Sequence, residues 1–275
     1  MSSAVFPVTK FAQSRSAERA TEMATIREKG LAAVTDADQA NGQKTKGVDL
    51  LAKFTAAQHD HPEFMTEKQV LTSCTSMVFA GSETTAISLS AVFFYLLRNP
   101  PVYRKLMAEL DEAVQSGLIA NREQGLVTWS ESQNLPYLDA VIQESFRLYP
   151  AAGLLLERIV PPQGIDILGE YIPGGTIVGC NAWVLHRRPE IFGDDVDTYR
   201  PERWLEASEE KLKEMKATMF QFGAGARTCI GKNISLLEVY KLVPAFLMRF
   251  EVSAAHYFNS EISNLVFSAL GTCIR

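Results

Sequence analysis

The sequence predicts a mainly α-helical fold with small antiparallel β-sheets, and three observations support that class. Apolar residues at helical spacing dominate the chain, and the longest such run extends from Thr66 to Leu97. Short β-type runs separated by proline and glycine are concentrated between residues 154 and 183. Hydrophobic residues make up 47% of the 275 residues, which is enough for a sizeable core.

Composition excludes several classes of function. The net charge is −5 and there is no run of basic residues, so we expect no nucleic-acid partner. The four cysteines are far apart and form no C-x-x-C pair, which argues against a zinc module or a disulfide framework and favours a reducing compartment. The first 20 residues lack the apolar core of a signal peptide or membrane anchor. We therefore expect an intracellular, monomeric protein with no anchor in this chain.

The N-terminal part of the chain predicts peripheral structure. Residues 12–34 have a charged helical pattern with a thin apolar stripe, typical of a surface helix. Residues 36–47 are polar and contain the turn signal Asn41-Gly42. A short helix that includes Leu50 and Phe54 follows. We place a domain boundary here. Residues 1–46 are expected to form a helix and a linker, and residues 47–275 form the second portion of the chain.

The long run from Thr66 predicts a single buried helix. Thr66 and Gln69 form a capping box at its start. Glu83 and the neighbouring hydroxyls would be costly in lipid, so we interpret the run as a core helix rather than a membrane span. Within it, residues 80–85 read Ala-Gly-Ser-Glu-Thr-Thr, a weak helix former. This stretch predicts either an exposed polar face or a local opening of the helical hydrogen-bond ladder.

Proline and glycine divide the remainder of the chain into further elements. Asn99-Pro100-Pro101 ends the long helix, and the apolar spacing from Tyr103 to Val114 marks the next one, which ends near Gly117. Another helix opens at Leu135-Pro136 and runs to Leu148. The runs 154–160, 164–168 and 176–183 predict a small antiparallel sheet. Residues 199–204 show no periodicity and predict a loop. The ends 250–252 and 265–269 could pair as a closing hairpin.

A glycine-rich loop delivers one cysteine to the start of the last long helix. Phe222 to Gly231 read FGAGARTCIG, and the apolar spacing that follows predicts a helix beginning directly after Cys229. Gly223, Gly225 and Gly231 would let the backbone adopt positive φ and approach a flat object closely. A helix N-terminus also favours a sulfur anion.

Several interpretations of this loop compete. The phosphate-loop pattern fails at Ala226 and Asn233, and the dinucleotide fingerprint fails at Thr228. No recognisable base accompanies a nucleophilic cysteine. The loop alone leaves a buried structural cysteine and an axial metal thiolate open.

Two charged residues share one face of the 136–148 helix. Glu144 and Arg147 are three positions apart, which fits an ordinary surface ion pair. Their apolar neighbours, among them Ile142 and Phe146, favour partial burial instead.

Four motifs in this order carry a resemblance. Residues 80–85, then Glu144-x-x-Arg147, then Pro201-Glu202-Arg203-Trp204, then the loop 222–231 resemble the cytochrome P-450 superfamily of haem-thiolate monooxygenases. The resemblance covers residue 47 to the C-terminus and implies an N-terminally incomplete cytochrome P-450 fold. Leu156-Glu157-Arg158 and Trp183-x-x-His186-Arg187 resemble fungal members, such as the pisatin-demethylase-like group.

The resemblance implies a role for each motif. Cys229 corresponds to the axial thiolate of haem b (iron protoporphyrin IX), with Gly223, Gly225 and Gly231 keeping the loop close to the porphyrin and Phe222 packed beside it. Arg227 and Arg158 match residues that hold the haem propionates.

Further positions follow from the same resemblance. Glu83 and Thr84 match the acid and alcohol that relay protons toward the haem, with Gly81 at a helix kink. Glu144, Arg147 and Arg203 match a buried structural ion-pair triad, and His186 is expected in a loop or at a helix start. The positions expected to face an apolar substrate are Ala80, Ala152 and Leu154.

The implied function is O2-dependent hydroxylation or oxidative demethylation of a hydrophobic small organic molecule, in secondary metabolism or detoxification. Electrons would come from an NADPH-dependent flavoprotein reductase, and a full-length member is expected at the cytosolic face of the endoplasmic reticulum membrane. Family members are longer than this chain, which lacks their N-terminal portion. The alternative hypothesis is therefore a truncated, non-catalytic remnant that binds haem weakly or not at all.

Overall fold

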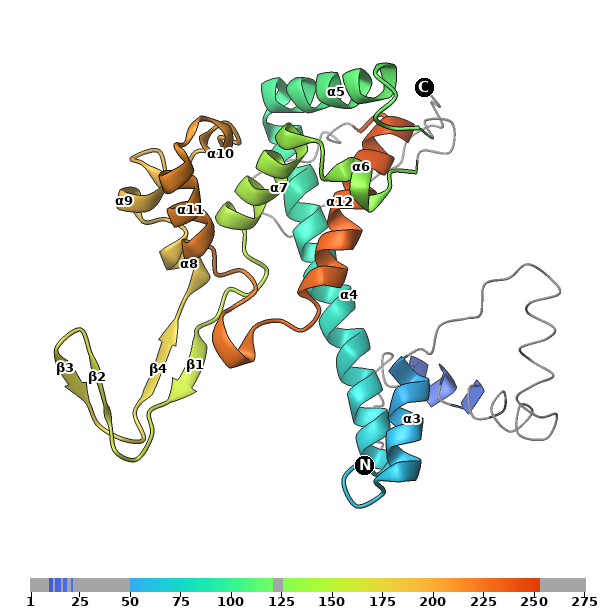
Figure 1. Ribbon diagram of the computed structural model, residues 1–275, viewed down its shortest axis with the longest axis vertical. Coiled ribbons are helices and arrows are strands. Elements are labelled where there is room, and N and C mark those ends of the chain that lie inside the picture. Colours follow the sequence, from blue (N-terminus) through green and yellow to red (C-terminus); the bar gives the residue numbers. More distant parts are fainter. Residues whose placement is uncertain are drawn as a thin grey trace, which may run out of the picture. The chain divides into compact units, whose positions relative to one another are not determined.

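A computed structural model describes residues 50–120 and 126–252, together with residues 10, 11, 13–15, 17, 18 and 21, which are helical. The chain divides into two compact units, residues 1–83 and 84–275 (Figure 1). The predicted domain boundary at residue 46, the loop 36–47 and most of the 12–34 helix lie outside the described residues. The second arm of the predicted 265–269 hairpin lies outside them as well.

In the first unit, helix α3 (Leu50–Asp60) confirms the short helix predicted there. The first part of helix α4 (Glu67–Arg98) belongs to the same unit. Its capping box forms as predicted, because the Thr66 backbone N–H donates to Gln69 Oε1 at 2.6 Å and the Gln69 N–H donates to Thr66 Oγ1 at 3.4 Å. Two of the backbone donors left open at a helix start are thereby satisfied.

Helix α4 is continuous through residues 80–85, so the local opening of its ladder that the sequence suggested is not present. Side-chain hydroxyls bond back along the helix instead, from Ser82 Oγ to the Val78 carbonyl (2.7 Å) and from Ser88 Oγ to the Thr84 carbonyl (2.9 Å). The burial predicted for α4 holds in its second half, where Val92 and Leu96 are almost fully buried. Residues 79–84 are exposed, as an outward polar face predicts.

By length and composition, α4 is the one helix among the described residues that could cross a membrane. A core helix of a soluble protein passes the same test, and the second half of α4 is packed in the helical core.

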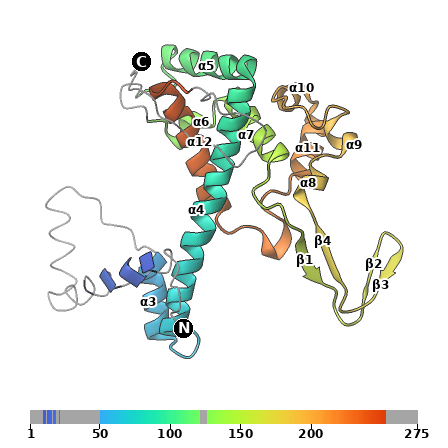
Figure 2. The ribbon, with the colours of Figure 1, turned by 180° about the vertical axis from the view of Figure 1, so that it is seen from behind.

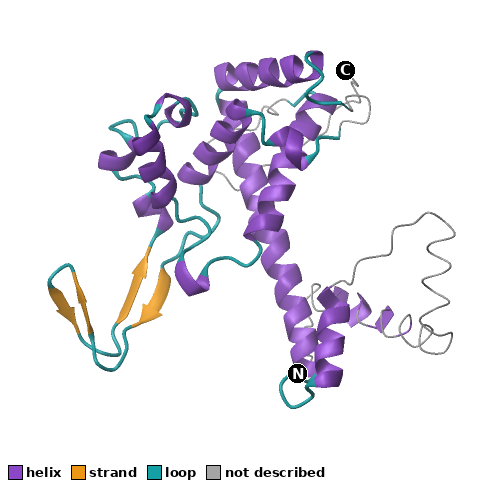
Figure 3. Cartoon of the chain, in the orientation of Figure 1, coloured by secondary structure: helices purple, strands orange, loops and turns teal. Residues whose placement is uncertain are grey.

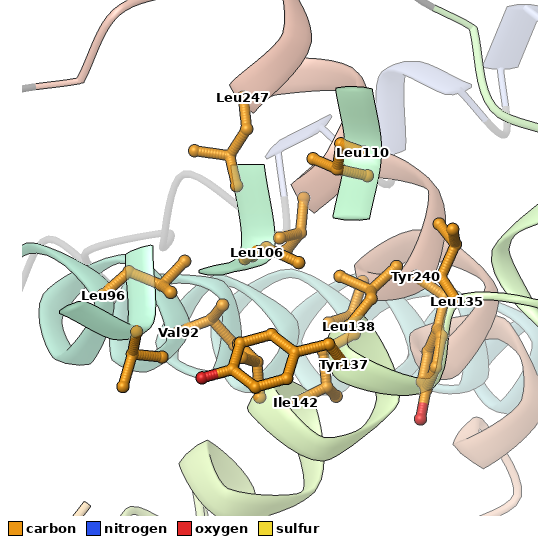
Figure 4. Packing of buried hydrophobic residues seen from close by; sticks show 14 of the residues in the cluster. Val92, Leu96, Leu106, Leu110, Leu135, Tyr137, Leu138, Ile142, Tyr240 and Leu247 are labelled. Atoms are coloured by element: carbon orange, nitrogen blue, oxygen red, sulfur yellow. The ribbon is translucent and has the colours of Figure 1, made fainter. Parts of the chain in front are cut away.

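Four helices complete that core in the second unit. They are α5 (Pro100–Gln115), the one-turn α6 (Trp129–Ser132), α7 (Pro136–Leu148) and α12 (Lys232–Arg249). Figure 4 shows the side chains of Leu106, Leu138 and Leu247 meeting between them. Both α5 and α7 begin with proline directly after their N-cap, since proline already has the helical φ and needs no N–H partner there. This start was predicted for α7, whereas at α5 the prolines were interpreted only as the end of the preceding helix.

Helix α12 crosses the core beside the second half of α4 (Figures 1 and 2). The rings of Phe93 and Phe246 join them edge to face with centroids 5.3 Å apart, and Thr85 Oγ1 donates to Ser235 Oγ at 3.2 Å. The first turn of α12, which directly follows the cysteine loop, is therefore tied to α4.

The segment after α7 contains two separate two-stranded antiparallel sheets (Figure 3). Strand β1 (Leu156–Ile159) pairs with β4 (Ile177–Cys180) with Leu156 opposite Cys180, and β2 (Ile165–Ile167) pairs with β3 (Glu170–Ile172). The prediction of one sheet is thus correct in kind. The predicted run 176–183 is too long, because residues 182 and 183 belong to a helix. That helix is capped by the Asn181 side chain, which accepts from the Trp183 N–H at 2.8 Å.

Four short helices follow and pack against α7. They are α8 (Ala182–Leu185), α9 (Pro189–Phe192), α10 (Arg203–Glu206) and α11 (Glu209–Thr218). A second apolar cluster joins Ala140 of α7 to Phe192, Trp204 and Met215. Residues 199–204, predicted as a loop, therefore include the start of α10, which depends on tertiary packing rather than on a helical repeat.

Candidate functional site

The cysteine loop is closed by its own backbone. The Gly223 N–H donates to the Phe220 carbonyl at 2.9 Å, and the Cys229 N–H donates to the Phe222 carbonyl at 2.8 Å. Between them lies a single 3-10 turn, η1 (Gly225–Arg227). The Thr228 hydroxyl donates to the same Phe222 carbonyl at 3.3 Å. The two ends of the loop are thus joined, and residues 224–230 are exposed.

Two of the three glycines have the positive φ that the sequence predicted. Gly223 has φ +66° and Gly225 has φ +68°, in the left-handed region that side chains disfavour. A Cβ added to Gly225 would meet nothing within 4 Å, so the space over this residue is open. Gly231 is an exception to the prediction, because it is the N-cap of α12 with φ −83°.

Cys229 stands at the start of α12, as predicted. The helix begins at Lys232, and the Lys232 N–H donates to the Cys229 carbonyl at 3.4 Å. The Cys229 thiol is exposed and forms no disulfide. A buried structural cysteine, the rival interpretation of this position, does not agree with that exposure.

The side chain of Phe222 packs the cysteine loop against the core. Its half-buried ring meets Phe146 of α7 edge to face, with centroids 6.0 Å apart, and the Lys232 Nζ lies 5.7 Å from the Phe222 ring centroid. On the other side, Leu156 Cδ1 of β1 lies 3.4 Å from the position a Cβ on Gly223 would take. The loop is therefore bounded by α7 and β1.

The structure brings the predicted triad together in full burial. Glu144 and Arg147 form a two-point pair, with Nε to Oε2 at 2.9 Å and Nη2 to Oε1 at 2.8 Å. Arg203 Nε donates to Glu144 Oε1 at 2.9 Å. Glu144 and Arg147 are fully buried and Arg203 is nearly so. The surface-pair interpretation is wrong, and the burial is more complete than the apolar neighbours indicated.

Other donors complete the shell around Glu144, and the sequence analysis assigned them no role. Trp204 Nε1 donates to Glu144 Oε2 at 2.9 Å, and the Arg200 backbone N–H donates to Oε1 at 3.0 Å. Asp195 balances Arg203, accepting from its Nη1 at 3.0 Å. Burial raises the pKa of Asp195, but hydrogen bonds from Arg203 and Arg200 outweigh it, so that the pKa is lowered and the carboxylate stays charged.

His186 lies in the turn that follows α8, in agreement with the expected loop position, and it is fully buried. Its Nδ1 lies 3.0 Å from the Arg147 carbonyl oxygen, and its Nε2 accepts from the Phe220 N–H at 2.7 Å. Burial, with further lowering from the charges of Arg147 and Arg187, brings the pKa of His186 to about 4 despite the hydrogen bond to the Arg147 carbonyl. The W-x-x-H-R pattern was the only sequence signal for it.

The two arginines expected at the haem propionates are exposed. Arg227 lies in η1, within the loop itself. Arg158 lies on β1, two residues after Leu156, and its Nη1 donates to the neighbouring Glu157 carbonyl at 2.7 Å. The contact between Leu156 and Gly223 places the strand that carries Arg158 next to the loop that carries Arg227.

The expected proton-relay residues lie on the exposed stretch of α4. Thr84 belongs to the second unit, and its neighbour Thr85 bonds Ser235, a contact that no sequence pattern indicated. Glu83 is exposed and belongs to the first unit. Of the expected substrate-facing residues, Ala80 and Leu154 are exposed and Ala152 is half-buried.

Comparison with known proteins identifies the family of this chain. The profile of the family described as Cytochrome P450 matches residues 1–264. The cytochrome P450 monooxygenase cicH of Emericella nidulans is 46% identical over 207 residues, which are 75% of this chain and 40% of the relative. Pisatin demethylase of Fusarium vanettenii is 44% identical over 177 residues, 64% of this chain and 32% of the relative.

The chain belongs to the cytochrome P450 family, and the resemblance found in its motifs is confirmed, including its fungal character. A third relative, the cytochrome P450 monooxygenase ACRTS1 of Alternaria alternata, is 38% identical over 225 residues, 81% of this chain and 59% of the relative. The chain thus spans between 32% and 59% of the length of these relatives.

The family implies a haem-thiolate centre, and the residues present fit such a group. Cys229 is exposed, the space over Gly225 is open, and Arg227 adds a cation in the same loop. A flat anionic ligand needs these three features together. Among the described residues no cluster of three or more histidine, cysteine or carboxylate side chains offers a rival metal site.

Replacing Glu144 by glutamine should destabilise the fold strongly. The change leaves two buried guanidinium groups without their shared counter-charge, and we expect a loss of about 3–5 kcal/mol in the free energy of unfolding. Asp197→Asn is the matched control, because the Arg187–Asp197 pair lies at the surface with Asp197 81% exposed, and it should cost less than about 1 kcal/mol. Urea unfolding of both variants measures the difference, and equal losses would contradict a dominant role for Glu144.

Acidification should destabilise the chain through His186. The neutral ring is favoured in the folded state, so the unfolded state binds more protons between pH 6.5 and pH 4, and stability falls as the pH falls through that window. The expected loss between pH 7.5 and pH 5 is about 2 kcal/mol. Urea unfolding across this range should give a steeper pH dependence for the wild type than for His186→Gln, and parallel curves would refute the assignment.

Proposed function

We propose that this chain is the haem-binding part of a monooxygenase, with Cys229 as the axial ligand of haem b. The observation that carries the proposal is the exposed Cys229 thiol on a glycine loop closed by backbone bonds at the start of α12. When bound through a thiolate, haem activates O2, because the thiolate pushes electron density toward the iron and favours O–O cleavage. The helix start supports the anionic sulfur.

The loop's neighbours would hold the porphyrin. Gly223 and Gly225 allow close approach of the backbone, Gly231 begins the helix, and Phe222 anchors the loop to α7. Arg227 and Arg158 would pair with the propionates, since a guanidinium matches a carboxylate in fork geometry. Their exposure leaves both free of buried ion pairs that would compete for them.

Thr84 and Glu83 would supply protons to the haem site. Both side chains are exposed, so each can exchange protons with water. The tie between Thr85 and Ser235 supports this placement of Thr84, because it fixes the neighbouring turn of α4 to the turn of α12 that follows the cysteine loop. Glu144, Arg147 and Arg203 would serve the fold and not the chemistry.

The substrate would be a hydrophobic small organic molecule, hydroxylated or oxidatively demethylated. Leu154, in the segment between α7 and β1, is 83% exposed and supports this proposal together with Ala152 and Ala80. The relative named pisatin demethylase supports it as well. Electrons would come from an NADPH-dependent flavoprotein reductase. The full-length protein would work in secondary metabolism or detoxification at the endoplasmic reticulum membrane.

A second candidate is a non-catalytic remnant with weak or no haem binding. It is favoured by the large apolar side chains that are exposed around β1, including Leu154 and Ile159. A closed pocket would cover such residues.

Cys229→Ala should abolish the red-shifted Soret band that reduced haem-thiolate proteins show with carbon monoxide. Cys180→Ala is the matched control, because Cys180 is also exposed and lies outside the loop, and it should keep the band. If the red-shifted Soret band persists in Cys229→Ala, Cys229 is not the ligand. Wild-type chain that takes up no haem would favour the remnant.

Thr84→Ala should divert electrons from product to hydrogen peroxide, because a hydroxyl that delivers protons is lost. The ratio of peroxide released to NADPH consumed should rise about tenfold or more in a reductase-coupled assay, with pisatin as the first test substrate. Thr72→Ala controls for a threonine elsewhere in α4, whose hydroxyl only bonds the Lys68 carbonyl. An unchanged ratio in Thr84→Ala would count against the relay.

A further inference from the structure

His186 joins two parts of the second unit that are far apart in sequence. Its imidazole lies between the backbone of Arg147, at the end of α7, and the backbone of Phe220, just before the cysteine loop. A carbonyl oxygen can only accept and an amide N–H can only donate. Nδ1 must therefore carry the proton and Nε2 must be bare, so both contacts require one neutral tautomer.

The contact with Phe220 sets the point from which the loop departs. The Phe220 carbonyl accepts from the Gly223 N–H at 2.9 Å, which forms the turn into the loop. Phe222 then receives the Cys229 N–H at 2.8 Å. Two hydrogen bonds, Phe220 N–H to the imidazole and Cys229 N–H to the Phe222 carbonyl, therefore connect His186 to the backbone of Cys229 through residues 220–222.

The other side of His186 is equally well fixed. Arg147 Nη1 donates to the His186 carbonyl at 3.0 Å, so that Arg147 and His186 each accept from the other's side chain. Arg147 in turn is paired at two points with Glu144. The side chains of His186, Arg147 and Glu144 are all buried, where hydrogen bonds are stronger and an unmade one costs most.

We propose that His186 is a positioning residue for Cys229, which transmits the rigidity of the Glu144 network to the cysteine loop. It touches neither the sulfur nor the expected haem, and acts by fixing the Phe220 amide. The inference rests on the proposed role of Cys229 as the ligand. Its chemical requirement is a side chain that is both donor and acceptor, which phenylalanine cannot supply and glutamine can supply in part.

Hydrogen exchange in the cofactor-free chain tests the positioning directly. In His186→Phe the amides of Phe220, Gly223 and Cys229 should exchange about tenfold faster or more, as loss of a buried hydrogen bond implies. His186→Gln should restore part of the protection. Ser145→Ala is the matched control, because its buried hydroxyl bonds Val141 and Tyr199 and not the loop. It should leave these three amides unchanged.

The same variants, loaded with haem, give the second readout. His186→Phe should show a smaller fraction of the thiolate Soret band at equal haem content, while Ser145→Ala keeps it. Faster exchange spread evenly over the chain, or unchanged exchange at the three amides, would overturn the proposal. Should the wild type lack the thiolate band, the assignment of Cys229 fails, and the exchange data still decide whether His186 orders the loop.

Discussion

The second unit depends on one buried carboxylate. Glu144 Oε1 accepts from Arg147, Arg203 and the Arg200 backbone, and Oε2 accepts from Arg147 and Trp204. An isolated buried carboxylate is very costly, and five donors are what make this one tolerable. Because the donors come from α7, from the segment before α10 and from α10 itself, the chain can meet that requirement only when these segments are assembled.

The network and the cysteine loop have opposite characters. Glu144 and Arg147 are excluded from water, whereas residues 224–230 are exposed around a loop closed by its own backbone. A buried network beside an exposed loop suits a site in which a bound ligand covers the exposed face of the loop. His186 is the residue through which we infer that the rigidity of the network reaches the loop. The exposed side is left for a group that needs close approach and a nearby cation.

Local rules predicted those parts of the fold that local chemistry decides. Thr66 and Gln69 predicted the start of α4, and Pro136 predicted the start of α7. The position of Cys229 before α12 also followed from spacing alone. These features depend on residues within one or two turns of each other.

Other features depend on partners distant in sequence, and the sequence could not reveal them. The short helix α10 forms around the buried Arg203 and Trp204, whose partner Glu144 is about sixty residues away. The burial of His186 was not predicted, because neither Arg147 nor Phe220 is near it in the chain. The tie between Thr85 and Ser235 spans 150 residues between two ordinary hydroxyls. The Glu144–Arg147 pair was found, but its complete burial required the structure.

We propose above all that the sulfur of Cys229 binds the haem iron. X-ray absorption at the iron edge of the haem-loaded chain tests it most directly, because it identifies the atoms bonded to the metal. The account predicts one sulfur atom in the first coordination shell of the wild type, and its loss in Cys229→Ser with no change in Cys180→Ala. A first shell of nitrogen and oxygen alone in the loaded wild type, or a sulfur signal that survives in Cys229→Ser, would contradict it.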